Sequence, residues 1–166
     1  MRFVPLTFIV GRAADVFGPA LADAVDSVLR ARFPTLSLGA GDRYESDPVE
    51  YAGWRELARR TPLLAAIEPY QAVFVPAEVM SVGTLTVPNA ADPLQVASLT
   101  RLLEELRAFA ADAAVPTDDV ELMELSARYL EDDLLISDDL DMQAYVQLML
   151  CAKQAAATRR ALWVVA

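Results

Sequence analysis

The sequence predicts an α+β fold: a single domain over residues 1–166, in which a small mixed β-sheet packs against about four to six helices. Two observations lead to this prediction. Apolar, strand-like stretches lie at both ends of the chain, RFVPLTFIV at residues 2–10 and ALWVV at 161–165. Because an exposed apolar strand invites aggregation through its edge, we expect both ends to enter one sheet. The second half of the chain repeats its apolar residues at helical spacing, which predicts a mainly helical second half.

The first half is predicted to alternate strands and helices. In the first strand, Leu6, Phe8 and Val10 share one face, and the other face is also largely apolar, so the strand should be well buried. A helix is expected over residues 19–33, where Pro19 suits its first turn. The remaining elements follow in chain order: a short strand at 36–38, a helix over 49–60, and strands within 71–76 and 80–88.

Three helices are predicted in the second half. Asp92 and Pro93 form a suitable cap and first turn, so the first helix is expected to begin there and to end before Pro116. The second should begin at Thr117 or Asp118, with Glu121 completing a capping box. The third should begin at Ser137 or Asp139 and bury Met142, Tyr145, Val146, Met149, Ala152 and Ala156.

The residue types present exclude several chemistries. The chain contains no histidine, so it cannot form a Ser-His-Asp triad, a Cys-His pair or a histidine-ligated metal centre. The single cysteine, Cys151, can form neither an internal disulfide nor a thiolate zinc site, and the single lysine, Lys153, gives little basis for Schiff-base chemistry. The sequence therefore favours a protein without enzymatic activity and without a cofactor.

The composition indicates a bacterial, cytoplasmic protein. Thirteen arginines against one lysine, with many Ala, Val and Asp residues, are typical of a GC-rich bacterial gene. No apolar run approaches the ~20 residues that a bilayer requires, and the apolar start of the chain is too short for a secretory signal, so we expect no membrane association. A net charge of −10 opposes contact with phosphate backbones, so nucleic acid is not expected as a partner.

Negative charge is concentrated in residues 112–141. This stretch contains eleven acids and a single base, Arg128, so its net charge of −10 equals that of the whole chain. Within it, the segment LEDDLLISDDLDM at residues 130–142 has six acids and no base. Acids in the first turns of helices account for some of this charge, but a solvated surface normally mixes both signs. A one-sided field is useful for steering an oppositely charged partner.

The main hypothesis is a non-enzymatic binding protein that docks a basic protein partner on an acidic helical face. A bacterial immunity protein or antitoxin that neutralises a cationic toxin has this size, acidity and lack of catalytic groups. The expected partner-binding residues are Glu131, Asp132, Asp133, Asp138, Asp139 and Asp141.

Two alternatives remain open. The first is a Mg²⁺-dependent hydrolase, because oxygen ligands suit Mg²⁺ and two predicted helices carry clustered carboxylates. The carboxylates in question are Glu104, Glu105, Glu121 and Glu124. The second alternative is a structural subunit of an assembly, which would show itself as a homo-oligomer built on the end strands.

Overall fold

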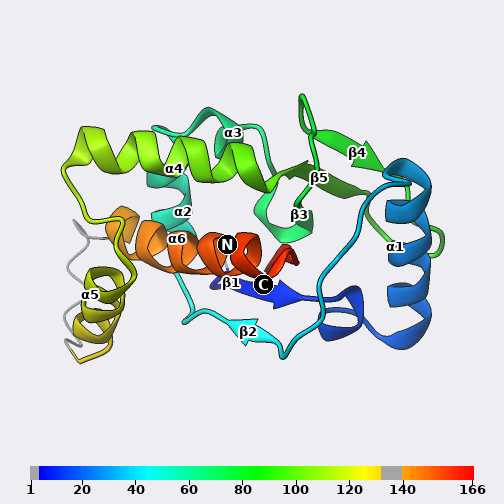
Figure 1. The fold of residues 1–166 in the computed structure, drawn as a ribbon, viewed down its shortest axis with the longest axis horizontal. Helices are drawn as coiled ribbons and strands as arrows, with labels where there is room; N and C mark the ends of the chain where they lie inside the picture. Colours follow the sequence, from blue (N-terminus) through cyan, green and yellow to red (C-terminus); the bar gives the residue numbers. More distant parts are fainter. Residues whose placement is uncertain (1–3, 132–139) are drawn as a thin grey trace.

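The computed structural model describes residues 4–131 and 140–166, and these residues adopt the predicted α+β fold (Figure 1). Within them, one six-stranded mixed sheet has the order β2-β1-β6-β3-β5-β4. The strands are β1 (Thr7–Gly11), β2 (Tyr44–Glu45), β3 (Ala72–Val75), β4 (Gly83–Leu85), β5 (Leu94–Ser98) and β6 (Ala161–Val165).

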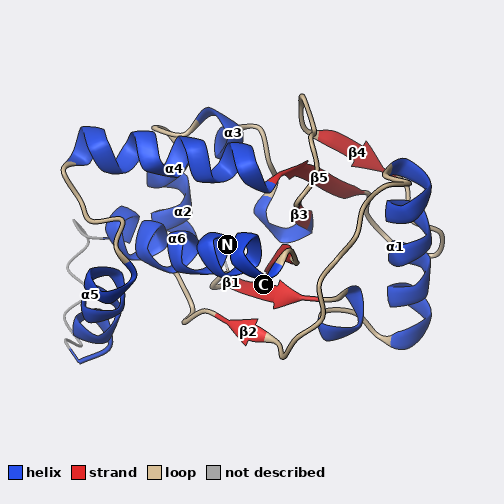
Figure 2. Ribbon diagram, viewed as in Figure 1, coloured by secondary structure: helices blue, strands red, loops and turns tan. Residues whose placement is uncertain are grey.

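Helices make up most of the second half of the described chain, as predicted (Figure 2). The α-helices are α1 (Pro19–Arg32), α2 (Tyr51–Ala58), α3 (Pro62–Ala65), α4 (Leu99–Ala113), α5 (Asp119–Glu131) and α6 (Leu140–Thr158). Two short 3₁₀ helices, η1 (Ala13–Asp15) and η2 (Pro69–Gln71), precede α1 and β3. None of the helices in the described ranges has the length and hydrophobicity needed to span a bilayer.

The two ends of the chain lie in the same sheet, as the sequence predicted. Strand β6 lies between β1 and β3 and runs antiparallel to both, so that Trp163 is opposite Ile9 on one side and Val73 on the other. Strand β3 also pairs in parallel with β5, and this parallel pair makes the sheet mixed. The C-terminal strand is therefore an internal strand of the sheet.

Apolar side chains cover both faces of the sheet. Along β1, Phe8 and Val10 point into a large cluster that α2, α4 and α6 complete, whereas Ile9 points into a second cluster beneath α1. Strand β6 alternates in the same way, with Leu162 in the large cluster and Trp163 in the second. The two-sided apolar pattern of the first strand was thus predicted correctly, because a strand with helices on both faces must be apolar on both.

The predicted helix start at Asp92 and Pro93 is wrong. Strand β5 occupies Leu94–Ser98, and α4 begins only at Leu99. The helix is capped by Ser98, whose Oγ accepts a hydrogen bond from the Arg101 backbone N–H at 3.3 Å. Pairing with β3 and β4 satisfies the backbone of this segment, so a contact distant in sequence decides between strand and helix.

Three smaller predictions need correction or fall outside the described chain. Residues 36–38 form no strand, and the short strand β2 lies instead at Tyr44–Glu45. On α6, Ala155 is buried and Ala156 is exposed, so the predicted buried stripe was wrong at its last position. The predicted start of that helix at Ser137 or Asp139 lies outside the described residues.

Candidate partner-binding site

Two residues of the predicted acidic face lie in described elements, at the end of α5 and the start of α6, and this end of the molecule is the one farthest from α1 (Figure 1). Asp141 is in the first turn of α6, where its Oδ1 accepts a hydrogen bond from the Met142 backbone N–H at 2.8 Å. Glu131 is the last residue of α5, but its side chain is not among those described. The predicted residues Asp132, Asp133, Asp138 and Asp139 lie outside the described residues.

Two acids at the start of α5 have structural roles. Asp118 caps it: its Oδ1 accepts hydrogen bonds from the backbone N–H groups of Val120 at 3.0 Å and Glu121 at 3.2 Å, as the capping-box pattern predicted for this position. Asp119 forms an ion pair with Lys153 on α6. Lys153 also donates a hydrogen bond to the carbonyl of Thr117 at 2.7 Å, so it ties the start of α5 to α6.

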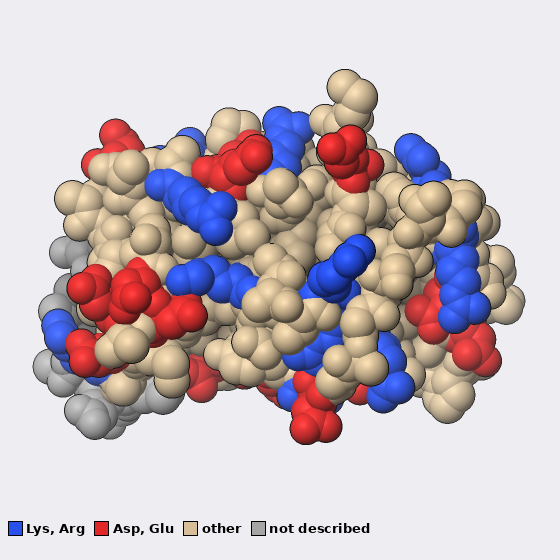
Figure 3. All heavy atoms as spheres, viewed as in Figure 1, with Lys and Arg blue, Asp and Glu red and all other residues tan. Residues whose placement is uncertain are grey.

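Other acids of α5 keep their charge uncompensated. Glu121 and Glu124 are exposed, and neither forms an ion pair with any other residue in the described ranges. Acidic side chains gather over α5 and the segment that leads into it, at the left of Figure 3. The described part of this face thus presents net negative charge to solvent.

A groove of mixed polarity lies beside the start of α5. It has a volume of about 290 Å³ and lies between β2, α5 and α6; we call it the α5–α6 groove. Its lining residues are Tyr44, Asp119, Met123, Leu150, Lys153, Gln154 and Ala157. Met123 is 63% exposed, and Val120, one turn earlier on α5, is 64% exposed. The surface therefore combines accessible apolar side chains with the paired charges of Asp119 and Lys153. The exposed Glu121 and Glu124 lie on the same helix, α5.

Helix α5 is held against α6 by apolar packing and by polar bonds. Leu122 is its fully buried residue among those described, and a polar network adds a second attachment. Gln147 Nε2 donates to Ser126 Oγ at 2.8 Å, and Ser126 Oγ donates to Asp47 Oδ2 at 3.3 Å. The backbone N–H of Asp47 donates in turn to Gln147 Oε1 at 3.2 Å. These bonds fix α5 relative to α6 and so fix two walls of the groove.

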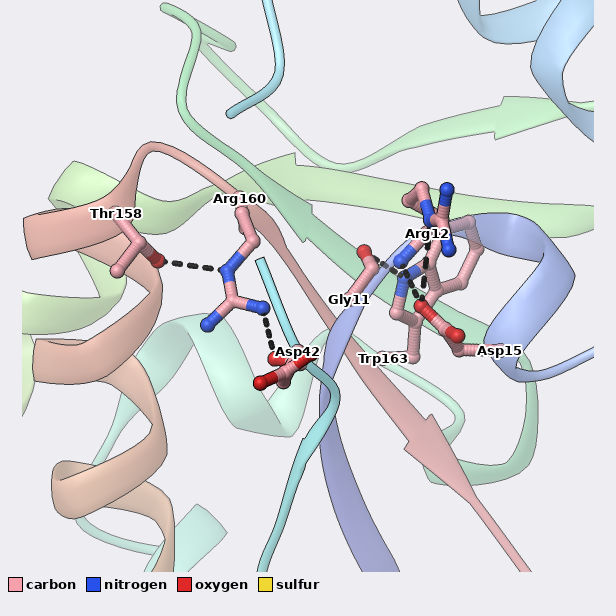
Figure 4. Close-up of polar contacts among 7 residues, drawn as sticks. All are labelled: Gly11, Arg12, Asp15, Asp42, Thr158, Arg160 and Trp163. Atoms are coloured by element: carbon pink, nitrogen blue, oxygen red, sulfur yellow. Dashed lines mark hydrogen bonds and ion pairs between the residues drawn. The ribbon is translucent and has the colours of Figure 1, made fainter. Parts of the chain in front are cut away.

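Arg160 positions the third wall. Its side chain is only 3% exposed, and its Nε donates a hydrogen bond to Thr158 Oγ1 at 2.8 Å, while Nη1 donates to the carbonyl of Asp42 (Figure 4). In the same loop as Asp42, the backbone N–H of Gly39 donates a hydrogen bond to the carbonyl of Arg159 at 2.8 Å. These contacts fasten the loop that leads into β2, and β2 carries Tyr44 to the edge of the groove. Partial burial raises the pKa of the Tyr44 hydroxyl above its ordinary value.

The groove residues were missed by the sequence analysis. Tyr44, Met123 and Leu150 come from three segments that meet only in the folded chain. One local signal existed: Val120 and Met123 are large apolar residues outside the buried stripe of an otherwise polar helix. Exposed apolar residues that adjoin one another are a common mark of an interaction surface.

The four glutamates of the magnesium alternative are not brought together. Glu105 accepts a hydrogen bond from the Leu63 backbone N–H at 2.7 Å and lies 3.5 Å from Arg101 Nε, so its carboxylate is occupied at the start of α3. Glu104, Glu121 and Glu124 are exposed. Within residues 4–131 and 140–166, no group of three or more His, Cys, Asp or Glu side chains is placed to hold a metal ion.

The nucleophilic side chains near the groove are not activated. Cys151 is buried, and this burial raises the pKa of its thiol, which disfavours the reactive thiolate. The Ser126 hydroxyl is engaged with Asp47 and Gln147, and the chain has no histidine to serve as its base.

The class that the fold and the site define is an α+β protein with an acidic, groove-bearing surface. No family model, curated protein sequence or solved structure matches the chain.

Proposed function

We propose that this is a non-enzymatic binding protein that docks a basic protein partner on the acidic face around α5 and the start of α6. The role we assign is that of a bacterial immunity protein or antitoxin whose partner is a cationic toxin. The single observation that best supports the proposal is the α5–α6 groove, because its accessible apolar side chain Met123 lies on the same helix as the exposed acids Glu121 and Glu124.

The two parts of this surface would contribute differently to binding. Tyr44 and Met123 can be covered by apolar groups of a partner, and such buried anchors supply most of the affinity of an interface. The charges of Glu121 and Glu124, together with those of Asp132, Asp133, Asp138 and Asp139 in the adjoining sequence, act at longer range. Charges of this kind mainly raise the association rate.

The test uses the basic protein encoded beside this gene and measures its association and dissociation rates across a salt series. Three variants are compared with the wild type: Glu121→Gln with Glu124→Gln; Asp132, Asp133, Asp138 and Asp139 all changed to Asn; and Met123→Ala. The acid variants should slow association about three- to tenfold at low salt and little at high salt, because salt screens the same field. Met123→Ala should mainly speed dissociation.

A matched control removes the same charge elsewhere. Asp23 lies on α1 and Glu78 lies before β4, at the sheet edge opposite β2, and both are exposed. Asp23→Asn with Glu78→Gln should leave the association rate within about twofold of the wild type, because these charges lie far from the proposed face. Equal effects of the control pair and of Glu121→Gln with Glu124→Gln would contradict a localised binding face. The absence of any basic protein encoded beside the gene would argue against the immunity role.

A further inference from the structure

A second pocket lies on the α1 side of the sheet, away from the α5–α6 groove. It has a volume of about 80 Å³ and is enclosed by the start of α1, the loop before β5 and the ends of β3, β5 and β6; we call it the α1 pocket. Voids larger than a water molecule are few in well-packed proteins, so a lined hollow of this size is a candidate ligand site.

One wall of the α1 pocket is a rigid aromatic surface. Trp163 is 1% exposed, and its Nε1–H donates a hydrogen bond to the carbonyl of Gly11 at 3.0 Å (Figure 4). The ring of Phe17 meets the Trp163 ring edge to face, with ring centroids 5.5 Å apart and an interplanar angle of 88°. Both rings are therefore fixed before any ligand arrives, which lowers the entropic cost of binding.

The rest of the lining is mainly apolar, with the polar side chains of Tyr70 and Gln71 and one carboxylate. Leu21 and Val25 of α1, together with Leu94 at the start of β5, face the same hollow as the two aromatic rings. Asp92 is the one charged lining residue, and no lysine or arginine lines the pocket. Asp92 is exposed, and its carboxylate forms no hydrogen bond or ion pair with another residue in the described ranges. The lining thus combines an apolar interior with an unpaired negative charge that solvent can reach.

The size and charge of the pocket select one class of ligand. A cavity of about 150 Å³ holds a benzene ring, so one of about 80 Å³ suits a smaller group such as a short branched alkyl chain. The Asp92 carboxylate favours a cation over a neutral or anionic group. We infer that the α1 pocket binds a short-chain aliphatic ammonium compound, with its alkyl group against Trp163 and Phe17 and its ammonium group at Asp92. This inference is independent of the proposed partner-binding function.

Three probes of similar size separate the contributions of charge and alkyl group: 2-methylpropylamine, 2-methylpropanol and 2-methylpropanoate at pH 7. The readout is the NMR signal of the Trp163 indole N–H in the ¹⁵N-labelled protein, with the Trp54 indole N–H as an internal reference because Trp54 belongs to the other apolar cluster. The amine should shift the Trp163 signal saturably in the millimolar range and leave the Trp54 signal in place. The alcohol should bind about fivefold more weakly, and the carboxylate should not bind.

Variants of lining residues complete the test. Asp92→Asn should reduce amine affinity to that of the alcohol while alcohol affinity stays unchanged, and Ala90→Leu should abolish binding of both because Ala90 also lines the pocket. Glu78→Gln, which removes an exposed charge outside the lining, should change neither. Equal binding of amine and alcohol by the wild type, an unchanged amine affinity in Asp92→Asn, or the lack of a saturable Trp163 shift would each overturn the inference.

Discussion

Gly53 of α2 lies directly against the backbone of Leu140, the first residue of α6. A Cβ atom at Gly53 would come within 2.9 Å of the Leu140 carbonyl carbon, closer still to its carbonyl oxygen, and 3.4 Å from Ala144 Cβ. Separations below 3.0 Å are not compatible with normal packing, so the two helices can approach this closely only because residue 53 has no side chain. This contact fixes the start of α6, which carries Asp141 of the acidic face.

Replacement of this glycine by alanine should destabilise the protein. Within a helix, Gly→Ala usually stabilises by about 0.5–1 kcal/mol, but here the added methyl group must push α2 and α6 apart. We expect Gly53→Ala to lower the free energy of unfolding by about 1–3 kcal/mol in urea titrations. Gly18→Ala is the control, because no atom lies within 4 Å of a Cβ at Gly18, and it should change stability by less than about 1 kcal/mol. A Gly53→Ala protein as stable as the wild type would show that this contact is not tight in solution.

Removal of the C-terminal strand should abolish cooperative folding. A chain that ends at Arg160 lacks β6, so β1 and β3 lose the strand that joins them, and the core loses the buried Leu162 and Trp163. Thermal melting followed by circular dichroism should then show no cooperative transition. Deletion of the exposed Ala166 alone is the control and should leave the melting curve unchanged. A truncated chain that melts like the full chain would contradict the sheet order.

The sequence predicted those parts of the fold that depend on local patterns. The apolar strands β1 and β6, the Pro19 start of α1 and the Asp118 cap of α5 are set by neighbouring residues, and each was predicted correctly. Leu94–Ser98 was assigned to a helix because Asp92 and Pro93 resemble a helix start. Only its pairing with β3 and β4, which lie elsewhere in the sequence, makes it a strand.

The candidate site was less accessible to sequence analysis for the same reason. The concentration of acids was visible because charge can be counted along the chain. The α5–α6 groove was not, because Tyr44, Met123 and Leu150 are brought together by a loop attached through Arg160 and by a polar network around Asp47. Both attachments join residues that are far apart in the sequence, and no local pattern indicates them.

Magnesium should leave the thermal stability unchanged. The Glu105 carboxylate already accepts the Leu63 N–H and pairs with Arg101, so a metal would have to displace both. We therefore expect the melting temperature to change by less than about 1 °C in millimolar MgCl₂, since a ligand that does not bind the native state cannot stabilise it. Glu121→Gln with and without Mg²⁺ provides the comparison. A saturable rise in melting temperature that is lost in Glu121→Gln would support the hydrolase alternative instead.

Alkaline pH should destabilise the protein through two buried groups. Burial raises the pKa of the Cys151 thiol above its ordinary value of 9.0. Burial also raises the pKa of the Tyr145 hydroxyl from 10.0 to about 12. Both groups stay protonated in the native state while their counterparts in the unfolded chain ionise. The free energy of unfolding is thus unaffected by Cys151 below its ordinary pKa. Above pH 9.0 the ionisation of Cys151 in the unfolded chain lowers the free energy of unfolding by about 1.4 kcal/mol per pH unit.

Urea titrations from pH 7 to 10.5 measure this dependence. Cys151→Ala should lower stability at pH 7 by leaving a small cavity, but its stability should fall less steeply between pH 9 and 10 than that of the wild type. Tyr145→Phe loses the hydrogen bond that the Tyr145 hydroxyl donates to the carbonyl of Pro116 at 2.7 Å, yet it retains Cys151 and should keep most of the wild-type slope in that interval, because the unfolded tyrosine ionises mainly above pH 10. Because the slope is compared, the different stabilities of the variants at pH 7 do not affect the conclusion. Equal slopes for Cys151→Ala and the wild type would mean that the thiol ionises as readily in the native protein as in the unfolded chain.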